Sequence, residues 1–204
     1  MPEPHLIDPG SPAGAADRGF SVRLAGPDDA EAWVHTHVEA LSAAYAELMP
    51  AEFVTHHHAR IPSMIWDRTA QFSQQHQPGS RPFRLAWIAE DRIGPLAVAE
   101  AGHGSTDWEL ARGFPAASTD LELQTLYTLP RGLGTGVGQA LLDIAVADQP
   151  AYLWIMAGNP RAEAFYRRNG FVPDGLESRA GPTWHDRPMF RMHRVARTAF
   201  GTAG

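Results

Sequence analysis

Four glycines within seven residues stand between an apolar stretch and a helical pattern in the second half of the chain. The segment reads Leu126-Tyr127-Thr128-Leu129-Pro130-Arg131-Gly132-Leu133-Gly134-Thr135-Gly136-Val137-Gly138-Gln139-Ala140-Leu141-Leu142. Because glycine has no Cβ, the amides of such a turn can approach a ligand closely, and the helix that follows adds unpaired N–H groups and a positive dipole end. The segment therefore predicts a strand, a turn and a helix that together hold an anion such as a phosphate or pyrophosphate. A tight turn without a ligand is the alternative.

The glycine spacing excludes two familiar phosphate loops. A GxGxxG pattern would need glycine at Val137 or at Gln139, depending on the frame, so a dinucleotide-binding fold is disfavoured. The lysine and the following serine or threonine of a Walker A loop are absent, which argues against a kinase or an ATPase.

Composition narrows the chemistry further. The chain has 204 residues, 44% hydrophobic and 20% charged, which is typical of one soluble globular domain. It has no cysteine, so thiolate catalysis, disulfides and cysteine-based metal sites are excluded. The net charge of −6 gives no general attraction to nucleic acid, although Arg187, Arg191, Arg194 and Arg197 could form a local basic patch. The first residues do not resemble a signal peptide, and no apolar stretch reaches the roughly 20 residues that span a membrane, so we expect a cytoplasmic protein.

The order of the expected elements places the glycine segment within a mixed sheet. We expect a flexible leader over residues 1–19, a folded domain over 20–197 and a flexible tail over 198–204. Strands are predicted over 20–24, 84–89, 95–100, 121–127, 152–156 and 189–195. Helices are predicted over 27–48, over 51–72 with a bend or a break at Pro62, and over 137–148 and 160–169. Residues 102–119 are expected to be a loop. This pattern predicts an α/β (α+β) fold with a mixed central sheet of about six to seven strands flanked by helices.

A second informative segment runs from Asn159 to Phe171. Asn159 is a strong N-cap, Pro160 suits the first helical position, and Gly170 can adopt the left-handed conformation that ends a helix. The segment therefore predicts a short capped helix with Ala162, Phe165 and Tyr166 on one face.

Both segments resemble motifs of the GNAT superfamily of N-acetyltransferases. The pattern Leu-Tyr-x-x-Pro followed by Gly-x-Gly-x-Gly-x-Ala-Leu-Leu resembles the acetyl-CoA loop of that family, and Asn-x-x-Ala-x-x-Phe-Tyr followed by Gly-Phe resembles its second cofactor element. The resemblance implies a single GNAT-type domain that uses acetyl-CoA as co-substrate and no metal.

The resemblance also implies which residues bind the cofactor. The backbone of Leu126 to Thr128 would line the pantetheine and the acetyl group, the glycine turn would face the pyrophosphate, and Asn159 would contact the pantetheine arm. The expected cofactor-binding residues are Leu126, Tyr127, Thr128, Gly134, Thr135, Gly136, Val137, Gly138, Gln139, Asn159, Ala162 and Tyr166. Whether the side chain of Arg131 helps to hold the pyrophosphate is left open.

Amide formation needs a base, an oxyanion site and a proton for the departing thiolate. The resemblance implies that the Tyr166 hydroxyl supplies that proton, with a buried core tyrosine as the alternative. For the base, Glu122 is the first choice, because period-two alternation places Glu122, Gln124 and Leu126 on one face of the strand that leads to the glycine segment. Glu100 is the second choice, and a water relay could replace either.

The histidines suggest a metal at first sight. His56, His57 and His58 are consecutive, however, so on a helix they point in different directions and cannot converge on one ion. We therefore expect no metal. His35, His37, Tyr45 and the segment Trp184-His185-Asp186 are better considered as acceptor-pocket candidates or as ordinary surface and core residues.

Several functions remain open at this point. The leading hypothesis is transfer of the acetyl group of acetyl-CoA to a primary amine of a small molecule, by direct attack in a ternary complex. The alternatives are acetylation of a protein amine and a non-catalytic acyl-CoA-binding sensor. We expect no nucleic-acid or membrane partner, and the chain could act alone or as a homodimer.

Overall fold

The computed structural model describes residues 19–79 and 82–195. The predicted leader, Gly19 apart, and the predicted tail over 198–204 lie outside the described residues. The described chain forms a seven-stranded mixed sheet in the order β1-β2-β3-β4-β5-β7-β6. The predicted α/β class, with helices beside a mixed sheet, is therefore confirmed.

The strands are β1 (Ser21–Leu24), β2 (Arg84–Asp91), β3 (Gly94–His103), β4 (Leu121–Thr128), β5 (Ala151–Met156), β6 (Val172–Arg179) and β7 (Pro188–Arg194). The α-helices are α1 (Ala30–Tyr45), α2 (Ala51–Ala59), α3 (Ile61–Gln75), α4 (Asp107–Ala111), α5 (Val137–Val146) and α6 (Pro160–Arg168). Short 3₁₀ turns are η1 (Pro27–Asp29), η2 (Pro130–Gly132) and η3 (Pro182–Trp184). The described residues group into two compact units. The first contains the residues up to Ala101 together with Thr125–Ala145, and the second contains Gly102–Gln124 and the residues from Val146 onward.

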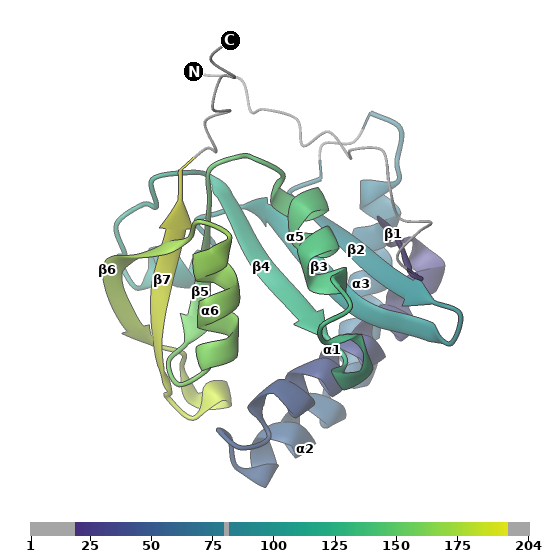
Figure 1. Ribbon diagram of the computed structural model, residues 1–204, viewed down its shortest axis with the longest axis horizontal. Helices are drawn as coiled ribbons and strands as arrows, with labels where there is room; N and C mark the ends of the chain where they lie inside the picture. The colour runs from purple at the N-terminus through teal and green to yellow at the C-terminus, as the bar shows by residue number, and fades with distance from the viewer. Residues whose placement is uncertain (1–18, 80–81, 196–204) are drawn as a thin grey trace. The chain divides into compact units, whose positions relative to one another are not determined.

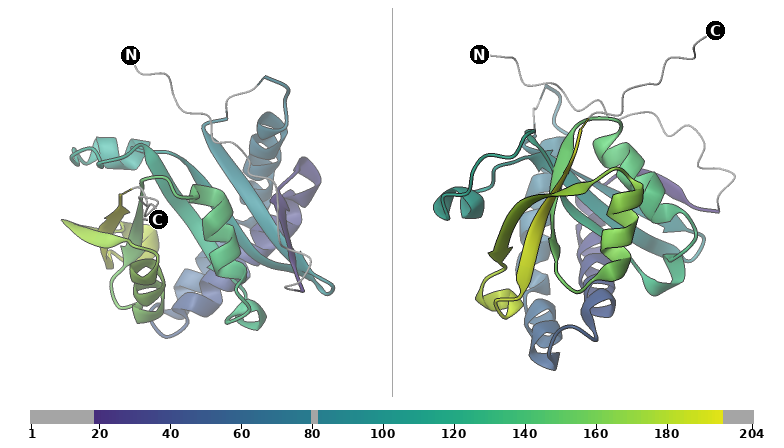
Figure 2. Two further views of the ribbon diagram at one scale, coloured as in Figure 1. Left: turned by 45° about the horizontal axis from the view of Figure 1, so that its top comes forward. Right: turned by 60° about the vertical axis from the view of Figure 1, so that its left-hand side comes forward.

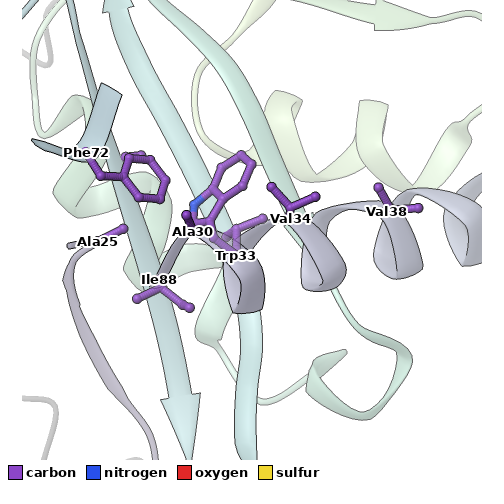
Figure 3. Packing of buried hydrophobic residues seen from close by; sticks show 9 residues of the cluster. Ala25, Ala30, Trp33, Val34, Val38, Phe72 and Ile88 are labelled. Carbon is purple, nitrogen blue, oxygen red and sulfur yellow. The ribbon is translucent and has the colours of Figure 1, made fainter. Parts of the chain in front are cut away.

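The core of the first unit lies between α1, α3 and the strands. Helices α1 and α3 pack on one face of β1 to β3, and α5 lies on the other face (Figure 1). Trp33, Val34 and Val38 of α1 meet Phe72 of α3 and Ile88 of β2 in this core (Figure 3). Their three- and four-residue spacing is what the sequence predicts for one buried helical face. The indole Nε1 of Trp33 also donates to the carbonyl of Trp87 at 3.1 Å, which fixes α1 on the sheet.

Helices α2 and α3 follow each other with only Arg60 between them. The sequence predicts a helical segment here that Pro62 bends or splits, and the structure shows the split. The break comes before Pro62 because proline lacks the amide that a helix interior needs, whereas in the first turn of α3 that amide would have no partner.

The second unit is built on β5, β7 and β6. Strands β5 and β7 are antiparallel from Ala151↔Arg194 to Met156↔Met189, and β6 pairs with β7 across a bulge between Pro173 and Glu177 (Figure 2). Helix α6 lies against one face of β5 and β7 (Figure 1). The first half of β4 runs parallel to β5, with Glu122 opposite Tyr152.

A buried carboxylate holds the segment over residues 102–120 onto β5. Glu109 of α4 is only 1% exposed. It accepts hydrogen bonds from the amide of Thr106 at 2.9 Å, its hydroxyl at 3.1 Å, the Tyr152 hydroxyl at 2.9 Å and the Trp154 indole at 3.0 Å. Four donors replace the water that the carboxylate loses, so its burial is compensated.

Two elements were not expected. Helix α4 lies in the predicted loop, and its signal is the capping-box sequence Thr106-x-x-Glu109, in which the Glu109 carboxylate accepts from the backbone amide of Thr106. Strand β6 was not placed, because Pro173 and Gly175 disfavour a strand interior; it lies at the end of the sheet order, where proline is tolerated.

Replacing Glu109 by alanine should destabilise the protein. The Tyr152 hydroxyl and the Trp154 indole would lose their acceptor inside the protein, so we expect Glu109→Ala to lower the free energy of unfolding by about 3 kcal/mol. Urea denaturation measures the change. The control Asp107→Ala alters an exposed residue of the same helix and should cost less than about 1 kcal/mol. Equal stability of the two variants would contradict the structural role of Glu109.

Candidate functional site

The glycine turn contains two kinds of glycine. Gly134 and Gly136 have φ angles of 80° and 89°, in the left-handed region, and an added Cβ would meet no atom within 4 Å at either position. These two are glycines because of their backbone conformation. Gly132 is buried, and its Cβ would lie 2.8 Å from Thr128 Cγ2 and 2.9 Å from Leu96 Cδ1, so it is a glycine because the turn packs tightly on β3.

The turn leaves backbone donors without an acceptor. The N–H groups of Gly134, Gly136 and Gly138 donate to no other residue that the structure describes. A backbone hydrogen bond from Ala140 N to Gly136 O at 3.0 Å begins the helix. Thr135 stabilises the bend, because its hydroxyl donates to Gly132 O at 2.8 Å. An open helix N-terminus with adjacent free amides attracts an anion, as the sequence predicts.

Buried residues of α5 hold that N-terminus in place. Val137, Leu141, Leu142 and Ala145 are all at most 1% exposed. The ten residues of α5 thus have an N-terminus with polar backbone groups and an apolar side that packs in the core. The unpaired amides therefore lie at the start of a helix that is packed in the core.

The strand before the turn is bordered by aromatic side chains. Tyr127 stacks on His37 of α1, with ring centroids 5.1 Å apart and an interplanar angle of 26°. His37 in turn lies edge-on to Trp33 at 5.2 Å, and the Arg68 guanidinium lies over Trp33, 4.5 Å from the ring centroid. The place that the sequence assigns to the acetyl end of the cofactor is therefore next to a residue of α1.

The second predicted element, in the second unit, has the expected local geometry. Asn159 caps α6, and its Oδ1 accepts from the amide of Ala162 at 3.1 Å. Gly170 ends the helix with a φ of 82°. Tyr166 is 8% exposed and lies edge-on to Phe165 and Phe171, with ring centroids 5.3 and 5.7 Å away. The helix and its caps match the prediction from the sequence.

Comparison with known proteins identifies the domain type. Residues 83–173, which include both motifs, match the acetyltransferase (GNAT) domain family. The chain thus contains a segment, somewhat less than half of its length, that matches the GNAT acetyltransferase domain. Members of this family transfer the acetyl group of acetyl-CoA, so the predicted enzyme class and co-substrate are confirmed at the level of the family. No curated protein matches the sequence significantly.

Solved structures share the GNAT fold at low sequence identity. The PaiA N-acetyltransferase of Thermoplasma acidophilum in complex with coenzyme A has a TM-score of 0.61 and 17% identity, over 86% of this chain and 98% of that one. The histone acetyltransferase HPA2 and related acetyltransferase of Corynebacterium glutamicum has a TM-score of 0.53 and 24% identity, over 89% and 99%. An acetyltransferase of Thermus thermophilus has a TM-score of 0.54 and 18% identity, over 86% and 96%. At these identities the likeness concerns the fold.

The two carboxylates considered as the base differ in their surroundings. Glu100, in the first unit, is 2% exposed and is paired with Arg68 at 2.6 Å and hydrogen-bonded by Gln71 at 3.0 Å. Glu122, in the second unit, is 5% exposed and accepts from Gln124 Nε2 at 3.1 Å. That bond confirms that Glu122 and Gln124 lie on the same face of β4. The Glu100 carboxylate is therefore engaged by two side chains of α3.

Tyr152 lies opposite Glu122 on the neighbouring strand. Burial first, and then the negative charges of Glu122 and Glu109, raise the pKa of the Tyr152 hydroxyl far above its usual range. Tyr152 is therefore a neutral hydrogen-bond donor, and its partner is Glu109. The role of Glu109 as the acceptor for Tyr152 was not predicted from the sequence, in which only the capping-box pattern marks Glu109.

The remaining polar candidates do not form one cluster. Within the described residues, no group of three or more histidine, aspartate or glutamate side chains is placed to hold a metal ion. His57 is buried against Phe53, whereas His56 and His58 are exposed, as expected for consecutive helical positions. His185 and Asp186 are exposed in a turn before β7.

Two of the four arginines that could form a basic patch are not on the surface. Arg191 is buried and pairs with Asp174 at 2.6 Å, and Arg194 is buried and donates to Gln149 O at 3.2 Å. Arg197 lies outside the described residues. In the described part of the chain no helix is long and apolar enough to cross a membrane.

The predicted site residues thus fall into two groups. Those from Leu126 to Gln139 belong to the first unit, where the glycine turn, α5 and the His37–Tyr127 stack are brought together. Glu122, Asn159, Ala162 and Tyr166 belong to the second unit. Each group has the local geometry that its motif predicts.

His37 should impose a pH dependence on stability. Its Nδ1 is buried without a partner, and burial, followed by the positive charges of Arg68 and His57, lowers the pKa of the imidazole to about 3. The unfolded chain takes up the proton near pH 6.5, whereas the folded protein resists it until about pH 3, so acid favours unfolding. Below about pH 6.5 the wild type should lose about 1.4 kcal/mol per pH unit relative to His37→Phe.

Urea denaturation at several pH values between about 7 and 4 measures this difference. The control His35→Phe removes an exposed histidine from the same helix and should follow the wild type. If His37→Phe and the wild type lost stability in parallel, His37 would not be held neutral by its environment.

Proposed function

We propose that the protein is an N-acetyltransferase that moves the acetyl group of acetyl-CoA to a primary amine of a small molecule. The observation that carries this proposal is the glycine turn, with its unpaired amides at the start of α5 in a domain of the GNAT acetyltransferase family. PaiA of Thermoplasma acidophilum, which shares the fold, binds coenzyme A.

In this proposal the turn binds the pyrophosphate of the cofactor. The amides of Gly134, Gly136 and Gly138 would donate to phosphate oxygens. Thr135 and Gln139 lie close to the N-terminus of the same helix, α5. The helix dipole adds to the attraction. No lysine or arginine at the turn is required, because backbone donors with no other acceptor supply the hydrogen bonds.

The pantetheine arm is assigned to residues on both motifs. The backbone of Leu126, Tyr127 and Thr128 would line its acetyl end, and Asn159 and Ala162 would contact its amides. The Asn159 oxygen is already used to cap α6, so the Asn159 contribution would come from its amide nitrogen or its backbone. Val137 would then act through packing, since it is fully buried.

The chemistry is assigned to Glu122 and Tyr166. The bound co-substrate supplies an acetyl thioester. Glu122 would take a proton from the amine, directly or through water, so that the nitrogen lone pair can attack the carbonyl, and a backbone amide of β4 would stabilise the oxyanion. The Tyr166 hydroxyl would give its proton to the departing sulfur. The chain has no cysteine to carry the acetyl group, which favours direct attack in a ternary complex over a covalent intermediate.

The acceptor is proposed to be a small cationic amine. The net charge of −6 attracts a protonated amine before it binds, and a buried carboxylate at Glu122 favours an amine over an acidic group. Acetylation of a protein amine is the second candidate.

Calorimetric titration tests the cofactor assignment, and an amine screen tests the reaction. We expect binding of acetyl-CoA and CoA but not of ATP or NAD, and then turnover with a small primary amine. The proposal would be contradicted if the protein bound neither acetyl-CoA nor CoA. Binding without turnover on any amine or lysine peptide would point to a sensor, and turnover on peptides alone would point to a protein acetyltransferase.

A charge placed in the turn should weaken cofactor binding. Thr135→Asp and Thr135→Asn have nearly the same shape and differ by one negative charge at an exposed position of the turn. We expect the aspartate variant to bind CoA about tenfold more weakly than the asparagine variant, because the charge repels the pyrophosphate and occupies the anion site. Titration at low and high salt measures this, and equal affinities would remove the pyrophosphate from the turn.

Removing the Tyr166 hydroxyl should affect the reaction and not the binding. Tyr166→Phe keeps the ring that packs on Phe165 and Phe171, so the affinity for acetyl-CoA should stay unchanged while kcat falls about 100-fold. If Tyr166→Phe turns over as fast as the wild type, Tyr166 is a core residue and not the acid.

Glu122→Gln should remove the base and retain the acceptor for Gln124. We expect kcat/KM to fall about 100-fold near neutral pH and the remaining rate to rise with pH as more of the amine is free in solution. A pH profile of wild type and variant measures both effects. A variant profile that coincides with that of the wild type would assign the proton to water or to another group.

A further inference from the structure

We infer that Arg131 and Asp91 form a latch that holds the glycine turn in its anion-binding conformation, so that Arg131 is a positioning residue and not a phosphate ligand. The inference rests on the proposed function, because it concerns how that function's cofactor site is kept in shape. Its evidence lies entirely within the first unit.

The guanidinium of Arg131 is directed to the hairpin between β2 and β3. It donates to the Asp91 carboxylate, to the carbonyl of Gly94 at 3.0 Å and to the carbonyl of Pro95. Three acceptors on a neighbouring element therefore receive its N–H groups. An arginine bound in this way has few donors left for a ligand, because its five N–H groups have a fixed planar geometry.

Asp91 is fixed independently of Arg131. Its Oδ1 accepts the amides of Ile93 at 2.8 Å and Gly94 at 3.1 Å, which closes the hairpin turn, while its Oδ2 receives Arg131. These two amides, and after them Arg131, hold the pKa of the Asp91 carboxyl below its usual value. The hairpin thus presents a preformed acceptor to the turn.

The residues around Arg131 show why a latch is needed. Gly132, the next residue, sits against Leu96 of β3, and Leu129 N donates to Leu96 O at 2.9 Å. Beyond Gly132, the left-handed Gly134 and Gly136 have no atom within reach of a Cβ, so little packing restrains them. Glycine has the largest conformational freedom to lose, and a turn that is fixed before binding avoids that cost when the ligand arrives.

Two variants separate positioning from direct binding, because the two roles predict opposite results for Asp91. Asp91→Asn keeps an oxygen for the hairpin amides but removes the charge that holds Arg131. If Arg131 bound phosphate directly, its release would leave CoA affinity unchanged or increase it. If the pair is a latch, Asp91→Asn and Arg131→Met should weaken CoA binding alike.

The experiment is calorimetric titration of CoA into the wild type, Arg131→Met, Asp91→Asn and the double variant. We expect each single variant to bind CoA about fivefold more weakly, and the double variant no more weakly than either single one. Glu90→Gln is the matched control. It removes the neighbouring charge of the same hairpin, which pairs with Arg23 at 2.7 Å, and should bind CoA like the wild type.

A second readout excludes a general loss of structure. With S-acetylpantetheine, which lacks the pyrophosphate, the variants should transfer acetyl groups as fast as the wild type, whereas their KM for acetyl-CoA should rise at unchanged kcat. The latch would be overturned if either Asp91→Asn or Arg131→Met bound CoA as tightly as the wild type. It would also be overturned if the variants lost as much activity with S-acetylpantetheine as with acetyl-CoA. A wild type that binds no CoA would instead overturn the proposed function.

Discussion

A carboxylate can lie inside a protein only where hydrogen-bond donors or a positive charge replace its water, and the arrangement of this domain depends on how that requirement is met. Glu109 is surrounded by the donors of Thr106, Tyr152 and Trp154. Those contacts anchor the segment over residues 102–120 on β5. Arg68 and Gln71 compensate Glu100, and through Arg68 they also connect α3 to the indole of Trp33. Buried charge is therefore used twice to fix a helix on the sheet.

The same contacts distinguish Glu100 and Glu109 from Glu122, the carboxylate that we propose as the base. A base must gain a proton and lose it again at a small cost. For Glu100, protonation would break a buried ion pair, and for Glu109 it would disturb four hydrogen bonds that hold α4. Glu122 lies beside Tyr152, which is kept neutral, so the charge of Glu122 has no ionised hydroxyl next to it.

Local signals in the sequence predicted most of the fold, and contacts between distant residues account for what they missed. The caps of α6 and the apolar face of α1 depend on neighbours within one helix, so their spacing was sufficient. Strand β6 is stabilised by its pairing with β7, which no pattern in Val172–Arg179 reveals. The stack of His37 on Tyr127 joins residues 90 positions apart along the chain, as their numbers show, and neither residue's surroundings in the sequence indicate the other. The contacts of Arg131 are of the same kind. The residue was noticed, but its acceptors lie on a hairpin about 40 residues earlier.

The glycine turn shows how one short segment can be both open and fixed. Amides that bind an anion must have no acceptor within the protein, yet amides without an acceptor do nothing to hold a chain in place. Here the two requirements are met by different residues. Gly132 and Leu129 fix the start of the turn on β3, and Val137 with Leu141 fixes its end in the core, so Gly134 and Gly136 can remain open between them. In the latch that we propose, a side chain that fixes the start more firmly would improve binding without touching the ligand, and an arginine directed to the β2–β3 hairpin would contribute to binding in this way.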